Sequence, residues 1–260
     1  MRQARRLTWV DAAIAIALGV GYVAVLVKSV ATLGYARDEG FYFHASSAYG
    51  RWLVELWDAP GKATTAKAVD AAWSVNHEHP GLMKTLFALS NLLLHKKLGL
   101  FAMEGTSYRF PAMALSGGLL SLVYVWGAQV RSRAAGVVAA IALGAMPRFF
   151  HAHLACFDAP IVALWTLCAY AFWRAVCVDG ARRGAAARGE SQREGVSAWD
   201  GVRWGGRSWR GTFGLALDTK HNSWFLPIVA VMHTAIVLVG ARVWGARGCG
   251  RRRGRGGGRW

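Results

Sequence analysis

The chain has 260 residues, of which 54% are apolar, and its 31 lysines and arginines against 14 aspartates and glutamates give it a net charge of +17. Long apolar blocks, with 13 tryptophans and 31 glycines, are typical of a membrane protein with several spans rather than of one or two soluble domains. The basic residues lie in short segments beside the apolar blocks, as expected of cytoplasmic loops. Because no nucleic-acid-binding module accompanies this charge, we expect no nucleic-acid partner.

The first apolar block, residues 9–33, is interrupted only by Asp11 and Lys28. As a helix it is long enough to cross the roughly 30 Å of hydrocarbon in a bilayer. It is too long for a removable signal peptide and has no small-residue cleavage site. The block therefore predicts a retained span, and the arginines that precede it place its beginning in the cytoplasm.

Two acidic features lie in the loop from residue 35 to about residue 108, which this orientation puts on the non-cytoplasmic side. Asp38 and Glu39 follow the first span directly, and Glu78 lies between two histidines later in the loop. Carboxylates at the mouth of a span cost free energy when they approach hydrocarbon, so they indicate a functional site. The alternative is a solvated helix start at the membrane surface.

An apolar segment in the same loop, residues 82–94, is too short to cross a membrane. An interfacial or re-entrant helix fits this length better. Lys84 and His95 would then reach the lipid headgroups.

Three further spans are predicted at residues 110–130, 134–147 and 159–178. Residues 131–133 form a tight turn between the first two, and its two arginines place it in the cytoplasm. The Arg/Gly/Ala-rich residues 179–210 have the composition of a flexible cytoplasmic loop.

The last apolar block, residues 213–240, is interrupted at residues 218–222, so it is either one long span or a broken one. Residues 241–260 are an Arg/Gly-rich tail that cannot pack a core. This tail either touches anionic lipid or marks the end of a truncated or mis-framed reading. Together these elements predict an all-α, polytopic transmembrane helical bundle over residues 1–240, with interfacial helices in its long first non-cytoplasmic loop.

Short motifs occur in a fixed order relative to these spans: Arg37-Asp-Glu-Gly40; Asn76-His-Glu-His-Pro-Gly-Leu-Met-Lys84; Arg109-Phe-Pro111; Pro147 with His151-Ala-His153 and Phe157-Asp-Ala-Pro160; and Gly214-Leu-Ala-Leu-Asp-Thr-Lys220. In this order they resemble the GT-C type of membrane glycosyltransferases, which use polyprenyl-phosphate sugars, in particular the protein O-mannosyltransferases and the lipid A aminoarabinose transferases. The resemblance covers about residues 9–230. Relatives carry more spans and usually a further C-terminal domain, so the resemblance implies a chain truncated at its C-terminus.

The resemblance implies transfer of a sugar from a polyprenyl-phosphate donor to a hydroxyl or phosphate of a protein, lipid or glycan, on the non-cytoplasmic face and with inversion. Such a displacement needs a carboxylate that takes the proton of the acceptor, and this help is worth about 10²–10⁴ in rate. Asp38 falls on the loop acid of the family and is the predicted base, with Glu39 as a supporting acid. The implied location is the bacterial inner (plasma) membrane rather than the endoplasmic reticulum.

The leaving group is a lipid phosphate, whose developing charge must be met by cations or a metal. The predicted substrate-binding residues are Glu78, His79, Lys84, Arg109, Asp158 and Lys220. Relatives often have Lys-Pro-Pro where this chain has His79-Pro80-Gly81, and a neutral histidine is a weaker electrostatic partner than lysine. Asp158 matches the Asp-x-Pro element of the family and is also a favourable helix N-cap.

The motifs indicate one candidate cofactor, a divalent metal ion. Glu78 falls on a loop acid that some relatives use for metal binding, and His77 would be a second ligand, with His151 and His153 as further donors. The alternative is that these histidines are hydrogen-bonding residues at the membrane interface.

Two other functions fit the sequence. A transporter or flippase for a lipid-linked sugar tends to have internal repeats and paired broken helices, whereas this sequence has one interrupted block and no visible repeat. A non-catalytic remnant would follow if the truncation removes the acceptor side. The expected partners are the donor lipid, membrane lipid, and an acceptor protein or glycolipid.

Overall fold

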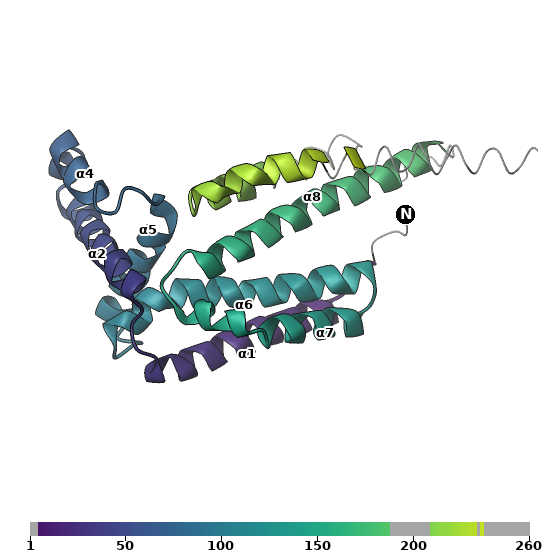
Figure 1. The fold of residues 1–260 in the computed structure, drawn as a ribbon, viewed down its shortest axis with the longest axis horizontal. Coiled ribbons are helices and arrows are strands. Elements are labelled where there is room, and N and C mark those ends of the chain that lie inside the picture. Colours follow the sequence, from purple (N-terminus) through teal and green to yellow (C-terminus); the bar gives the residue numbers. More distant parts are fainter. Residues whose placement is uncertain (1–4, 188–208, 233–234, 237–260) are drawn as a thin grey trace, which may run out of the picture. The chain divides into compact units, whose positions relative to one another are not determined.

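The computed structural model describes residues 5–187, 209–232 and 235–236, which belong to two compact units, Met1–His221 and Asn222–Trp260. These residues contain helices and no strand, which confirms the all-α prediction for the described part of the chain. The helices of the first unit are α1 (Trp9–Ser29), α2 (Arg37–Asp58), α3 (Pro60–Ala63), α4 (Ala66–Trp73), α5 (Gly81–Ser90), α6 (Glu104–Val130), α7 (Arg133–Gly144) and α8 (Asp158–Ala187) (Figure 1).

Helical segments of other types extend or connect these helices. The 3-10 turn Val30–Thr32 continues α1, the π-helix Asn91–Lys97 continues α5, and the 3-10 helix Pro147–His153 follows α7. Residues 209–217 form a further helix, which ends before residues 218–220. The 3-10 helix His221–Trp224 and the helical residues 225–232 come next, so the last apolar block is broken.

Local sequence explains where several helices begin. Thr8 precedes α1, and its backbone N–H and its hydroxyl both donate to Asp11 Oδ2, over 2.8 and 2.7 Å, as in a capping box. Ser132 accepts a backbone N–H at the start of α7. Ala36 has no polar side chain to cap α2, and the carboxylate of Glu39 accepts the Ala36 N–H over 2.9 Å instead.

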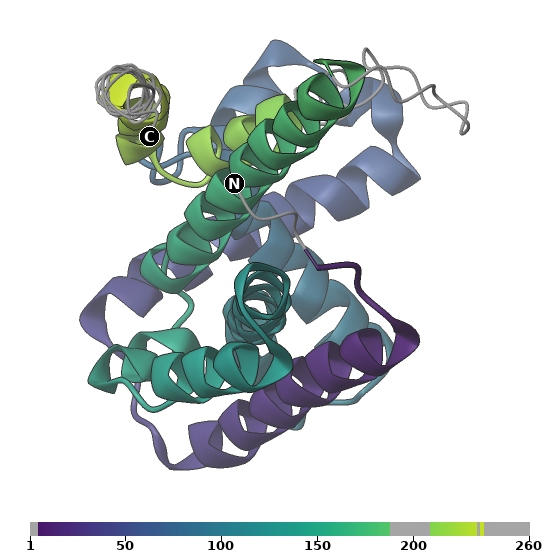
Figure 2. The same cartoon turned by 90° about the vertical axis from the view of Figure 1, so that its right-hand side faces the viewer.

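Helix α6 lies at the centre of the first unit, and it packs against α1, α5, α7 and α8. Viewed nearly end-on in Figure 2, α6 is surrounded by α1, α7 and α8. Helix α1 runs antiparallel to α6: Asp11 near the start of α1 contacts Tyr124 near the end of α6, and Leu26 shares a buried cluster with Met113 at the other end.

Glycines let α6 approach two neighbouring helices closely. A Cβ atom added to Gly117 of α6 would lie 2.7 Å from the carbonyl oxygen of Gly19 in α1. A Cβ atom added to Gly136 of α7 would lie 2.5 Å from the carbonyl oxygen of Tyr124 in α6. Small residues at such crossings are typical of membrane helices, which associate through close backbone packing.

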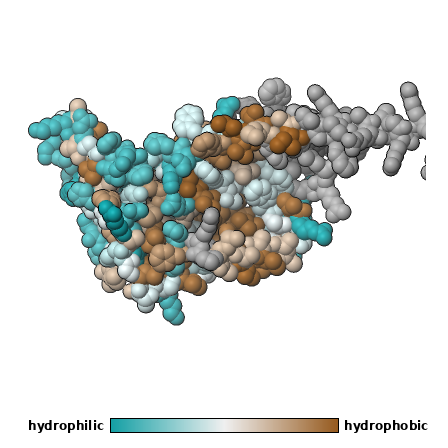
Figure 3. Space-filling model, viewed as in Figure 1, coloured by the Kyte–Doolittle hydropathy of each residue, from teal (hydrophilic) through white to brown (hydrophobic). Residues whose placement is uncertain are grey.

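Two described helices are long and apolar enough to cross a membrane, namely α1 with its extension (Trp9–Thr32) and α6. The outer side of α1 is also apolar, because Ile16, Val20 and Val25 are each more than 60% exposed. Figure 3 shows hydrophobic residues over α1 and α7 and hydrophilic residues over α2 and α4. An extended exposed apolar surface of this kind is suited to contact with lipid.

The predicted third and fourth spans differ from the observed helices. Helix α7 has 12 residues, so it is about 18 Å long and shorter than the roughly 30 Å of a hydrocarbon core. The prediction of a single-helix span at residues 134–147 is therefore wrong. Helix α8 begins as predicted but continues through Ala187, so the first part of the predicted flexible loop 179–210 is helical. Residues 188–208 and the tail 241–260 lie outside the described residues.

The polar residues that follow α1 form helices rather than an open loop. Helix α2 has 22 residues, and its small side chains Ala45 and Ala48 are buried with Tyr49. This face packs against α4 and α5, and the Tyr49 ring lies 4.3 Å from the ring of Trp73 in α4. The first loop therefore has a packed core of its own, which fixes the positions of both acidic motifs.

Candidate active site at the beginnings of α2 and α8

The carboxylate of Glu39 and the guanidinium of Arg109 form a buried ion pair. Arg109 Nε donates to Glu39 Oε1 and Arg109 Nη2 donates to Glu39 Oε2, both over 2.7 Å. The Glu39 side chain is 0% exposed and the Arg109 side chain 2%. A bidentate contact of this kind fixes the orientation of both side chains and is stronger than a single neutral hydrogen bond.

The same pair joins several backbone segments. The backbone N–H groups of Ala36 and Ala155 each donate to Glu39 over 2.9 Å, and the Arg109 guanidinium lies 4.8 Å from the centre of the Tyr35 ring. Each carboxylate oxygen of Glu39 thus accepts two N–H groups. Through these contacts and the Arg109 hydrogen bonds to the carbonyl oxygens of Leu33 and Gly34, the pair connects the residues after α1, the start of α2 and the segment before α8. Both charged groups are buried and do not face an open surface.

Asp38 lies beside this junction, in the first turn of α2, and its side chain is exposed. Tyr42 lies one turn further along α2. Burial raises the pKa of Tyr42 to about 12, with further contributions from Cys156, Asp38, Asp158 and Glu78 in that order. The three predicted site acids that are exposed thus all contribute to the electrostatic environment of Tyr42, although they come from α2, the loop before α5 and α8.

The rings of Tyr42, His79 and Phe157 lie against one another, next in the chain or one turn away from these acids. The Tyr42 and Phe157 ring centres lie 4.4 Å apart, and the His79 ring lies 5.7 Å from Tyr42 and 5.2 Å from Phe157. Burial lowers the pKa of His79 below its ordinary 6.5; Glu78 opposes this shift, and the cations Lys84 and Lys220 add to it. His79 is therefore a neutral imidazole at pH 7, which offers a hydrogen bond but no positive charge to a phosphate.

Lys84 holds the loop that carries Glu78 and His79. Its ammonium donates to the carbonyl oxygens of Asn76 and His79 over 2.7 and 2.8 Å, and it lies 5.1 Å from the centre of the Tyr49 ring. The side chain is 0% exposed, and burial lowers its pKa to about 8. The expectation that Lys84 reaches lipid headgroups is wrong, because its charged end is used inside the protein.

Asp158 and Lys220, both predicted to bind the donor, form an ion pair. Lys220 Nζ lies 2.7 Å from Asp158 Oδ1, and the two side chains are 31% and 57% exposed. Asp158 is the first residue of α8, and Lys220 follows the helix of residues 209–217. An ion pair at this exposure is weak, so Lys220 can exchange Asp158 for another anion at little cost.

An apolar cavity of about 530 Å³ opens beside Asp158. Its walls come from the middle of α6, the end of α7 and the first turns of α8, and His151 is its other charged or titratable lining residue. The aliphatic lining residues are Leu119, Leu143, Met146, Ile161 and Val162. Asp158 therefore belongs both to the ion pair with Lys220 and to the lining of an apolar cavity.

The predicted metal ligands are not gathered into a complete site. Within the described ranges, no group of three or more His, Cys, Asp or Glu residues is placed to hold an ion. His77 and Glu78 are exposed, and His77 Nδ1 lies 3.3 Å from the carbonyl oxygen of Ser74. His153 Nε2 is hydrogen-bonded to Ser29 over 2.8 Å, while His151 lines the cavity. Metal binding by His77 and Glu78 would need a ligand from outside these groups.

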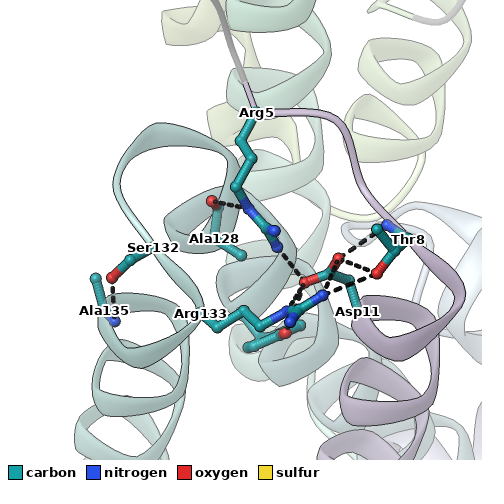
Figure 4. A network of polar contacts seen from close by, with 8 residues as sticks. Arg5, Thr8, Asp11, Ala128, Ser132, Arg133 and Ala135 are labelled. Carbon is teal, nitrogen blue, oxygen red and sulfur yellow. Dashed lines mark hydrogen bonds and ion pairs between the residues drawn. The ribbon is translucent and has the colours of Figure 1, made fainter.

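A second buried acid, Asp11, interrupts the first apolar block of the sequence and is 0% exposed. Figure 4 shows that Arg5 and Arg133 both point toward its carboxylate. Arg133 Nε donates to Asp11 Oδ1 over 2.9 Å, and the Tyr124 hydroxyl donates to the same oxygen over 3.1 Å. The sequence contains one signal for this role, because Thr8 and Asp11 have capping-box spacing. No residue pattern near Asp11 predicts that Arg133, 122 residues away in the chain, is its partner.

Comparison of the chain with protein-family models, with curated proteins and with solved structures finds no match.

Proposed function

We propose that this protein is a membrane glycosyltransferase that moves a sugar from a polyprenyl-phosphate donor to a hydroxyl or phosphate acceptor, with inversion. One observation carries the proposal. The rings of Tyr42, His79 and Phe157 lie within 5.7 Å of one another, which brings together the chain segments that carry Asp38, Glu78 and Asp158, and Asp158 also lines an apolar cavity. Such an arrangement suits a reaction between a polar acceptor and the headgroup of a lipid.

Asp38 is the proposed general base, because its carboxylate is exposed while that of its neighbour Glu39 is fully engaged. In the proposed step the acceptor oxygen bonds to the anomeric carbon and gives its proton to Asp38. The bond between that carbon and the phosphate oxygen breaks, and the lipid phosphate leaves with the electron pair. General-base help of this kind is worth about 10²–10⁴ in rate.

Lys220 is the proposed cation for the leaving phosphate. It is partly exposed, and its partner Asp158, which lines the cavity, is an exposed carboxylate that a phosphate can replace. Arg109 and Lys84 have buried partners inside the protein, and His79 is neutral at pH 7. In the proposal these three residues position the site, and Lys220 supplies the charge that a leaving phosphate requires.

The cavity is the proposed place for the part of the polyprenyl chain next to the phosphate. Its volume of about 530 Å³ lies within the roughly 300–1,000 Å³ of typical ligand pockets. The aliphatic lining matches an isoprenoid chain, and the polar lining residues Asp158 and His151 belong with its charged end.

The test is sugar transfer from a polyprenyl-phosphate sugar in membranes that contain the full chain, with Asp38→Asn compared against the native protein. Asp58→Asn is a matched control, because Asp58 is an exposed acid at the other end of the same helix. We expect Asp38→Asn to lower the rate by about 10²–10⁴ and Asp58→Asn to leave it unchanged. Equal rates for native chain and Asp38→Asn would remove Asp38 as the base. Absence of transfer by the native chain would favour the non-catalytic alternative.

A further inference from the structure

A cluster of exposed apolar side chains lies immediately before α6. Leu93, Leu98, Leu100 and Met103 are 48%, 59%, 64% and 49% exposed. They fall within eleven consecutive residues, 93–103, which we call the leucine turn. A soluble surface rarely gathers so many large apolar side chains unless they have a binding role.

The leucine turn is held in a defined conformation. At the end of the π-helix the N–H of Leu98 donates to the carbonyl of Leu93 over 2.9 Å, and the N–H of Leu100 donates to the carbonyl of Leu94 over 2.7 Å. Gly99 has a φ of +61°, the left-handed conformation that ends many helices. The exposure of the leucines is therefore a property of an ordered turn.

The turn is also attached to the first turn of α6. Asn91 donates from its side-chain amide to Glu104 over 3.2 Å and to Ser107 over 3.0 Å. Ser90 donates to the carbonyl oxygen of Ser107 over 2.5 Å, and His95 Nδ1 lies 2.7 Å from the carbonyl oxygen of Phe101. Ser90 and Asn91 thus fix the segment directly before the leucine turn to α6, while the His95 contact joins two residues within the turn itself.

Because the leucine turn is attached to α6, its depth in a membrane depends on where the N-terminal end of α6 lies. Helix α6 has 27 residues, so it is about 40 Å long, whereas a hydrocarbon core measures about 30 Å. A helix of this length that crosses close to the membrane normal reaches the headgroup region with at least one end. The leucine turn lies directly before Glu104, at the N-terminal end, and is placed to meet that region.

Two lysines complete the pattern. Lys96 and Lys97 are exposed within the leucine turn, between Leu93 and Leu98. Aliphatic side chains next to lysines are suited to the boundary between acyl chains and headgroups, where the chains bury the apolar part and phosphates meet the ammonium groups. A protein-binding centre would instead be enriched in aromatic residues and arginine.

We propose that the leucine turn inserts into the leaflet at the N-terminal end of α6 and that Lys96 and Lys97 bind anionic phospholipid headgroups there. This role goes beyond sugar transfer, and it requires only that α6 crosses the membrane together with α1, against which it packs. It also replaces the predicted headgroup contacts of Lys84 with those of two lysines further along the chain.

The experiment uses the full chain in lipid nanodiscs, with its four native cysteines replaced by alanine. A single cysteine at Leu100 carries an environment-sensitive fluorophore, and brominated phosphatidylcholine or brominated phosphatidylglycerol is the quencher. Val20→Cys on the exposed side of α1 reports on the span itself, and Lys67→Cys on α4 reports on a water-exposed position. Iodide measures access from water at each position.

We expect lipid quenching at Leu100 and Val20, iodide quenching at Lys67, and stronger quenching at Leu100 by the anionic lipid. Lys96→Gln with Lys97→Gln should lower the preference for anionic lipid by about 5-fold per lysine, whereas Lys67→Gln should not change it. Lipid quenching at Val20 with iodide quenching at Leu100 would overturn the insertion and leave the turn as a protein-binding surface. Quenching at Leu100 without a headgroup preference would overturn the role of the lysines. Iodide quenching at Val20 would overturn the span on which the proposal rests.

Discussion

Glu39 and Arg109, 70 residues apart in the chain, share two N–H···O contacts of 2.7 Å with almost no exposure to solvent. The ion pair connects the acidic motif Asp38-Glu39 to the beginning of α6, which carries Arg109. Asp38 is the next residue to Glu39, so its position depends on this buried pair. The pair is therefore the first place to test the construction of the site.

Removal of one partner should destabilise the fold strongly. Arg109→Met leaves the Glu39 carboxylate buried without its cation, which typically costs about 3–5 kcal/mol. Arg109→Lys keeps the charge but loses the bidentate geometry, so we expect an intermediate loss of stability. Thermal unfolding in detergent measures both, and Arg51→Met, which changes an exposed arginine of α2, is the control. An unfolding temperature equal to the native value for Arg109→Met would contradict the buried pair.

Lys84 should make stability depend on pH. Its pKa is about 8 in the folded protein and has an ordinary value of 10.5, so between these values the unfolded chain binds a proton that the folded chain has released. Stability contributed by this group should therefore rise as the pH increases through that window. The measurement compares unfolding temperatures at about pH 7.5 and about pH 9.5, which lie on the two sides of the lowered pKa.

The substitution Lys84→Met should abolish this rise and lower stability at both pH values, because the carbonyl oxygens of Asn76 and His79 lose their donor. Lys67→Met removes an exposed lysine of α4 and should keep the rise. A rise of equal size in Lys84→Met would assign the pH dependence to another group.

The crossing of α1 and α6 should tolerate no side chain at Gly117. Gly117→Ala places a methyl group 2.7 Å from the Gly19 carbonyl oxygen, and overpacking of this kind typically costs about 1–3 kcal/mol. Gly118→Ala is the matched control, because nothing lies within 4 Å of a Cβ atom at that position. There the change should be neutral or stabilising, because alanine favours helix over glycine. Unfolding in detergent compares the two; equal effects would show that the helices do not cross at Gly117.

Lys220 should affect donor binding more than stability. If it meets the donor phosphate, Lys220→Gln removes a hydrogen bond to a charged group, worth about 1.5–3 kcal/mol, and lowers kcat/KM for the donor by at least 10-fold. Lys62→Gln is the control, because Lys62 also forms an exposed ion pair, with Glu55 over 2.6 Å. The measurement is the transfer rate as a function of donor concentration. An unchanged kcat/KM in Lys220→Gln would remove the lysine from the phosphate site.

Several features could be predicted because they depend on neighbouring residues. The long apolar helices α1 and α6, the turn before α7 and the start of α8 all follow from apolar block length, charge and capping residues. The break at residues 218–220 also follows from a local polar interruption. Helix α7 lies within the apolar block from which a span is predicted but ends at Gly144, because an apolar composition does not show where a helix ends.

The sequence by itself determined that this is a helical chain with several long apolar blocks, and Asp38, Glu78 and Asp158 were among the candidate site residues that it indicated. The structure shows two described helices, α1 and α6, that are long and apolar enough to cross a membrane. Only the tertiary structure decided that Glu39 faces Arg109, that Lys84 lies inside, and that Asp158 meets Lys220. The physical reason is that a helix begins and continues according to residues within a turn or two, whereas the partner of a buried charge is chosen by the packing of helices that are distant in the chain.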